Sequence, residues 1–241
     1  MNTGLKSRVI FATVCHGPIF TKRYSQQVNK VGKQDTVYVL TDHPELFPDC
    51  ITRDYLTFMG YSHFTYYSKL LFLFSLLEEK KERINYVDAD FLKTIFNKEL
   101  IVDDTTFFTS VAVPYNQTLL SRLDSNKQQY IEWYNFLEEN GLETIGENVF
   151  TYVTEAFWSF PYSENISKIA DRAKELQTRI EHIFAKDPLH WSGTPLKRYA
   201  KTGIGFGEGT AMSIIVKEFS IALKAVSHNK YLFNKKNFHI L

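Results

Sequence analysis

Arg83-Ile-Asn-Tyr-Val-Asp-Ala-Asp-Phe91 is the stretch around which the rest of the chain can be interpreted. It begins as a short apolar strand and ends in two carboxylates, Asp88 and Asp90, which are one position apart. Because side chains alternate along a strand, both carboxylates are expected on the same side. Two such charges repel each other unless a cation lies between them, and oxygen ligands suit a hard divalent ion that also binds a substrate phosphate. The stretch therefore predicts a Mn²⁺ or Mg²⁺ site. The competing interpretation is a strand end that turns into solvent.

The segments before this stretch alternate between strand and helix patterns. Near-continuous apolar runs are typical of parallel strands that are covered on both faces, and apolar residues at helical spacing indicate amphipathic helices. The expected order is strand 9–14, helix 20–31, strand 36–41, a short strand 51–55, helix 66–82 and then the Asp-X-Asp strand. This alternation predicts an α/β sandwich with a mostly parallel central sheet.

The second half of the chain is less regular. Its expected elements are a β-rich segment 106–113, helix 119–140, a strand-forming segment 149–160, helix 163–185, a loop 187–207, helix 208–219 and strand 221–226. Asn140-Gly141 is a helix-stop signal. Glu155 lies inside the strand-forming segment, and a charge in a central strand needs a partner or a function.

Polar residues follow three of the predicted strands at the point where each strand ends. They are Thr13, Cys15 and His16 after the first strand, Asp42 after the second, and the two carboxylates at positions 88 and 90. Ligands of parallel α/β sheets bind at the carboxyl ends of the strands. We therefore expect these three strand ends to converge on one binding site.

Composition sets broad limits on the class of protein. The chain has 241 residues and a formal net charge of +1, so no overall field attracts a polyanion. Its two cysteines make no disulfide framework, and the apolar run at residues 9–14 is too short for a signal peptide or a membrane span. These features predict one soluble domain in the cytoplasm of a bacterial or virus-infected cell.

Two further motifs lie at residues 37–44 and 67–70. Both resemble segments of nucleotide-sugar-dependent glycosyltransferases of the GT-A fold. Val37-Tyr-Val-Leu-Thr-Asp-His-Pro44 is similar to a strand end of the blood-group A/B and α-1,3-galactosyl transferase family. Tyr67-Ser-Lys-Leu70, followed by an apolar helix and the Asp-X-Asp strand, resembles a segment shared with glycogenin-like transferases. The resemblance covers residues 7–97. It implies a single domain over residues 1–241 with a Rossmann-like α/β/α sandwich, in which 1–97 binds the nucleotide and 98–241 binds the sugar and the acceptor.

The resemblance also implies roles for individual residues of the first half. By this resemblance, the base and ribose of the donor are held by Thr13, Cys15 and His16, and Asp42 contributes to the same pocket. Lys69 faces the donor. Asp88 contacts the ribose or the metal, and Asp90 holds the metal against the diphosphate. The alternative for Lys69 is an ordinary lysine on a helix surface.

The second half departs from the family pattern. Gly207-Glu208-Gly209-Thr210 is the best positional match to the acidic turn that opens a late helix in retaining members. Either Glu208 or Glu155 is then expected to bind sugar hydroxyls or to assist the acceptor, and simple helix capping is the alternative for Glu208. His190 and Lys197 resemble the His-X-X-Gly-X-X-Lys tail of glycogenin-like enzymes, with Lys197 at the diphosphate. His239 is the other candidate for a third metal ligand.

The function implied by the resemblance is a Mn²⁺- or Mg²⁺-dependent transfer of a sugar from a nucleotide donor, typically a UDP-sugar, to a hydroxyl of a glycan. The late acidic residues favour retention of configuration. Two alternatives stay open. One is a phage-type DNA glycosyltransferase that acts on a hydroxylated base, and the other is a nucleotide-sugar-binding module without catalytic activity.

Overall fold

The computed structural model describes residues 9–62, 65, 67–90, 92, 105–109, 112–114, 127–143, 151–153, 157–184 and 207–225. The first half of the chain contains β1 (Ile10–Cys15), α1 (Pro18–Gly32), β2 (Thr36–Thr41), the 3-10 turn η1 (Pro44–Leu46), β3 (Ile51–Asp54), α2 (Tyr55–Met59), α3 (Ser68–Lys80) and β4 (Ile84–Val87). The second half contains β5 (Phe107–Thr109), β6 (Ala112–Pro114), α5 (Lys127–Glu139), β7 (Thr151–Val153), β8 (Phe157–Phe160), α6 (Ile166–Phe184), α9 (Gly207–Glu218) and β9 (Leu223–Ala225).

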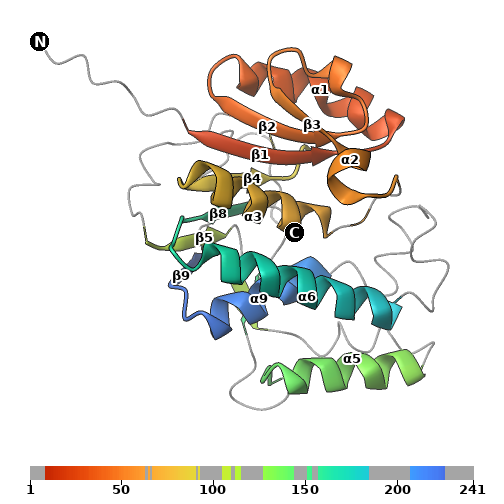
Figure 1. The fold of residues 1–241 in the computed structure, drawn as a ribbon, viewed down its shortest axis with the longest axis vertical. Coiled ribbons are helices and arrows are strands. Elements are labelled where there is room, and N and C mark those ends of the chain that lie inside the picture. The colour runs from red at the N-terminus through yellow and green to blue at the C-terminus, as the bar shows by residue number, and fades with distance from the viewer. Residues whose placement is uncertain are drawn as a thin grey trace, which may run out of the picture.

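The main sheet of the described residues has seven strands in the order β3-β2-β1-β4-β8-β5-β9. β1 pairs in parallel with β2 on one side and β4 on the other, and β8 runs antiparallel to both β4 and β5. β5 and β9 are parallel, so β8 alone reverses the common direction among these strands. The predicted α/β class with a mostly parallel sheet is confirmed, and the arrangement is compatible with a Rossmann-like fold (Figure 1).

The strand-forming segment 149–160 does not continue as one strand. The segment forms two strands in two different sheets, because β7 pairs with β6 whereas β8 enters the main sheet between β4 and β5. An unbroken strand of this length would extend over about 40 Å. The neighbouring β4 has four residues, so most of such a strand would have no partner.

The sheet separates two apolar clusters because successive side chains point to opposite faces. On the face covered by α1, Phe11, Val37 and Val87 pack with Val28 of the helix. On the other face, β-strand side chains pack against α3, α6 and α9, and Trp158 is fully buried there beside Tyr86. Each fully buried large apolar side chain stabilises the fold by about 1.5–3 kcal/mol.

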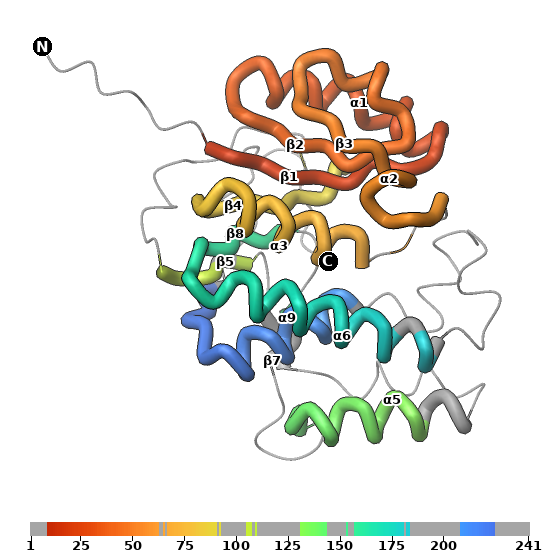
Figure 2. The backbone as a smooth tube through the Cα atoms, viewed as in Figure 1, coloured from red at the N-terminus to blue at the C-terminus, as the bar shows by residue number. Residues whose placement is uncertain are grey.

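The helices on the larger cluster pack in sequence. α6 lies along α3, α9 lies against α6, and α5 packs on the outer side of α6. Figure 2 shows α3, α6 and α5 one below the other in this view. The helix stop predicted at Asn140-Gly141 is confirmed, because α5 ends at Glu139 and Gly141, two residues later, adopts a left-handed φ of 67°. Within the described ranges, no helix combines the length and hydropathy needed to cross a membrane.

Candidate functional site

The carboxyl ends of β1, β2 and β4 lie next to one another, as the sequence predicts. Cys15, the last residue of β1, is paired in register with Thr41 at the end of β2. Burial raises the pKa of the Cys15 thiol far above its usual range, and the charges of Asp42, Asp90 and Asp88 raise it further. The carboxylates that follow β2 and β4 are therefore within electrostatic reach of the end of β1.

Asp88 is held by two side chains on the α3 side of the sheet. The Lys69 Nζ lies 2.9 Å from Asp88 Oδ1 and 3.3 Å from Oδ2. The Tyr86 hydroxyl donates a hydrogen bond of 3.1 Å to the same Oδ1. Strand alternation places Tyr86 and Asp88 on one side, where the first turn of α3 presents Lys69. The Asp88 carboxylate is thus oriented by contacts from two elements.

Glu208 joins this arrangement from the start of α9. Its Oε1 lies 3.1 Å from the Lys69 Nζ, and only 1% of the residue is exposed. We call Lys69, Tyr86, Asp88 and Glu208 the lysine-centred cluster. It connects α3, the end of β4 and the first turn of α9, which are distant in the chain.

Burial and the neighbouring charges act in opposite directions on the ionisable groups of the cluster. Burial raises the pKa of Glu208 to about 7, although the positive charge of Lys69 acts in the opposite direction. Burial also disfavours the charged form of Lys69, but Asp88 and Glu208 keep its pKa well above the ordinary value. Lys69 therefore carries a buried positive charge and faces two carboxylates. The alternative of an ordinary surface lysine does not hold, because Lys69 is only 7% exposed.

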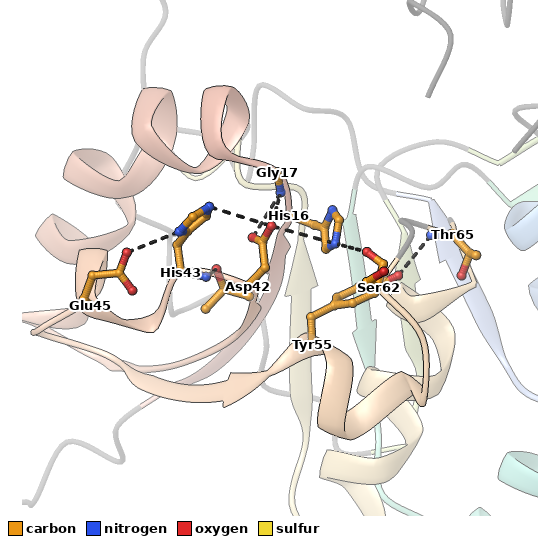
Figure 3. A network of polar contacts seen from close by, with 9 residues as sticks. His16, Gly17, Asp42, His43, Glu45, Tyr55, Ser62 and Thr65 are labelled. Atoms are coloured by element: carbon orange, nitrogen blue, oxygen red, sulfur yellow. Dashed lines mark hydrogen bonds and ion pairs between the residues drawn. The ribbon is translucent and has the colours of Figure 1, made fainter. Parts of the chain in front are cut away.

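His16 and Asp42 form a second polar network at the same edge of the sheet (Figure 3). Both Asp42 carboxylate oxygens accept from the Gly17 N–H at 3.0 Å, so the carboxylate lies beside the start of α1. His16 Nε2 is 2.8 Å from the Ser62 carbonyl oxygen, and its ring packs on Tyr55 with centroids 4.3 Å apart. This network ties the turn after β1 to the turns after β2 and α2.

The remaining predicted site residues differ in accessibility. The side chains of Thr13 and Cys15 are completely buried, and the Thr13 hydroxyl has no hydrogen-bond partner among the residues that the structure describes. Asp90 is partly exposed on the turn after β4. Glu155, Lys197, His190 and His239 lie outside the described residues. Their roles stay predictions, as do the donor contacts expected of Thr13, Cys15, His16 and Asp42.

Tyr86 is a site residue that the sequence reasoning missed. A tyrosine two positions before an aspartate on a strand points to the same side as that aspartate, so the pattern could have revealed it. Burial raises the pKa of Tyr86 well above its ordinary value, and the Asp88 charge adds to this effect. The phenol therefore stays protonated and acts as a hydrogen-bond donor to the carboxylate.

Over the described ranges, no group of three or more His, Cys, Asp or Glu side chains is placed to hold a metal ion. To hold a metal ion, Asp88 and Asp90 would need further ligands from a substrate or from elsewhere in the chain. Comparison with protein-family models gives no match, and a search among curated proteins gives none either.

Proposed function

We propose that the chain is a metal-dependent glycosyltransferase that moves a sugar from a nucleotide-sugar donor to a hydroxyl acceptor. The observation that carries the proposal is the lysine-centred cluster at the carboxyl edge of the sheet. It places a buried acidic side chain, Glu208, beside the first carboxylate of an Asp-X-Asp turn. Open α/β sheets also bind nucleotide ligands at the carboxyl ends of their parallel strands, which is where the cluster lies.

The charge at this edge fits a divalent cation. Lys69 supplies one positive charge against the carboxylates of Asp88, Asp90 and Glu208, so the group keeps a net negative charge even when Glu208 is protonated. Hard oxygen donors that leave room for other ligands suit Mn²⁺ or Mg²⁺ shared with a diphosphate. Asp88 and Asp90 are the residues that would hold the ion. When bound, it would supply positive charge to the leaving nucleoside diphosphate.

The side chains of the cluster have separate tasks in this proposal. Tyr86 and Lys69 orient the Asp88 carboxylate. Glu208 lies at the start of α9 and accepts hydrogen bonds from hydroxyls of the donor sugar, which fixes the sugar relative to the reacting bond. Because Glu208 is buried and has a pKa of about 7, it can also hold or release a proton near neutral pH.

A phosphate site at the start of α1 is disfavoured by the position of Asp42. Dinucleotide-binding βαβ units place a pyrophosphate at this helix N-terminus. Here the Asp42 carboxylate accepts from Gly17 directly before the helix, so an incoming phosphate would meet a like charge. This supports a diphosphate bound at the turn after β4 over one bound by the first β-α turn.

The proposal is tested by the effect of nucleotides and metal on thermal unfolding. Wild-type protein should melt at higher temperature with UDP and Mn²⁺ together than with either alone. At a ligand concentration of about 100 times Kd the gain is about 2.7 kcal/mol, which corresponds to roughly 5–10 °C for a chain of this size. If neither UDP nor other nucleotides shift the melting temperature in the presence of metal, the proposal fails.

Variants then locate the site. Asp90→Asn should abolish the joint effect of metal and nucleotide, whereas Asp49→Asn, at a surface carboxylate that pairs with Lys33 at 3.8 Å, should keep it. Mass spectrometry of donor hydrolysis across a panel of nucleotide sugars identifies the sugar. The same panel with glycans and with hydroxymethylated DNA distinguishes the two acceptor classes. If nucleotide sugars bind but are neither hydrolysed nor transferred, the alternative of a non-catalytic binding module is favoured.

A further inference from the structure

We propose that Gln27 of α1 is a positioning residue that fixes the Asp88-Ala89-Asp90 turn from the side of the sheet opposite Lys69. Its side-chain amide donates a hydrogen bond to the Ala89 carbonyl oxygen, which lies between the two carboxylates. As a role in metal binding, this inference rests on the proposed function. The claim that Gln27 holds the turn in place can be tested without any ligand.

The turn is fastened on both faces of the sheet. On the α3 face, Lys69 and Tyr86 bind the Asp88 side chain. On the α1 face, Ala89 is 1% exposed and packs in the cluster with Val28 and Val87. Gln27 precedes Val28 and binds the Ala89 carbonyl oxygen, so α1 fixes the direction of the peptide group that joins Ala89 to Asp90.

The position of Gln27 on its helix distinguishes it from its neighbour Gln26. Buried or partly buried apolar residues at Phe20, Tyr24, Val28 and Val31 form the inner stripe of the helix. Gln27 lies beside this stripe and is partly buried, whereas the preceding Gln26 is exposed. The hydrogen bond from Gln27 limits rotation of the backbone at Ala89, and such a rotation would move the carboxylates on both sides of it. Metal ligands must be positioned to within a few tenths of an ångström, so they depend on supporting contacts of this kind.

Gln26 provides a matched control for the test. Gln27→Met keeps the length of the side chain but removes the amide donor, and Gln26→Met makes the same change one position away, where the structure describes no contact with the turn. Gln27→Glu keeps the shape and replaces the donor by an acceptor. Methionine, glutamate and glutamine have similar helix propensities, so the helix itself should be little affected.

The first measurement is hydrogen exchange of residues 84–92 in the full chain without metal. Loss of one hydrogen bond should make exchange about five-fold faster in the Gln27 variants, with no change in Gln26→Met. The second is the Mn²⁺ affinity at saturating UDP, read from the electron paramagnetic resonance signal of free Mn²⁺. We expect the dissociation constant to rise about five-fold in Gln27→Met and more in Gln27→Glu.

The outcomes separate this inference from the proposed function. If the wild-type protein binds no Mn²⁺ with any nucleotide, the proposed function fails, and the role of Gln27 in metal binding fails with it. If the wild type binds Mn²⁺ but the Gln27 variants bind it equally well, only the inference about Gln27 is overturned. Unchanged exchange in residues 84–92 of the Gln27 variants overturns the positioning role whatever the metal does.

Discussion

Lys69 shows how one buried cation organises a site. A lysine buried without partners would lose its charge, because burial disfavours the ionised amine. Here two carboxylates from distant parts of the chain keep it charged. Replacing Lys69 would leave both carboxylates without their positive partner, which is far more costly than removing a surface ion pair. The cluster therefore stabilises the contact of α9 with α3 while it positions the acidic groups.

Glu208 makes folding depend on pH in a defined window. Its pKa is about 7 in the folded protein against an ordinary value of 4.5, so the folded state retains a proton that the unfolded state releases between these pH values. Below pH 4.5 the contribution of Glu208 to stability is fully present, and it is lost as the pH rises through about 7. The free energy of unfolding attributable to this group therefore falls across that range.

The measurement compares urea unfolding of the wild type and of Glu208→Gln from pH 4 to pH 8. The stability of the wild type relative to the variant should decline as the pH rises towards about 7 and then level off. Glu164→Gln, at an exposed carboxylate, serves as the control and should run parallel to the wild type. A parallel profile for Glu208→Gln would contradict a raised pKa at this position.

Arg172 links three elements on the side of the sheet away from α1. Its guanidinium group, on α6, contacts Glu218 Oε2 at 2.9 Å at the end of α9 and Asn140 Oδ1 at 2.7 Å after α5. A third contact reaches Glu175 on α6 itself. Arg172 therefore forms a bridge between helices.

Replacement of Arg172 should weaken the helix packing. We expect Arg172→Met to lower the free energy of unfolding by about 1 kcal/mol, because the contacts are charge-assisted but the side chain is partly exposed to solvent. Lys174→Met is the matched control on the same helix. Its ammonium lies 3.8 Å from Asp171 and is 65% exposed, so its loss should cost less than about 0.5 kcal/mol. Equal effects of the two substitutions in chemical denaturation would show that the bridge contributes nothing.

Elements were predictable where the pattern is local. The second strand was predicted at 36–41 and is found at Thr36–Thr41, because its apolar run is bounded by turn residues. The segment 149–160 was not resolved into β7 and β8, because both strands are rich in strand-forming residues. Which sheet each strand joins depends on partners elsewhere in the chain.

The whole sheet has unequal local stability because of its strand order. β1 and β4 each have a strand on both sides and helices on the faces, whereas β3 and β9 lie at the two edges of the described sheet. Opening a central strand breaks two ladders of hydrogen bonds and exposes both apolar clusters. Opening an edge strand breaks one ladder.

Native-state hydrogen exchange tests this ranking. Amides of β1 (Ile10–Cys15) and β4 (Ile84–Val87) should exchange slowest, with free energies of opening near that of global unfolding. Amides of β3 (Ile51–Asp54) and β9 (Leu223–Ala225) should exchange faster. Slower exchange at an edge strand than in β1 would contradict the strand order, or would reveal a partner that covers the edge.

The sequence by itself determined the alternation of strands and helices in the first half and the polar groups that end β1, β2 and β4. These features are local: an apolar run makes a buried strand, and turn residues end it. Parallel pairing then brings the strand ends together. Only the tertiary structure decided that Glu208 reaches Lys69, and that Gln27 supports the turn after β4. Those contacts depend on how α9 and α1 pack on the sheet, and no periodicity in the chain encodes the distance between two side chains on separate elements.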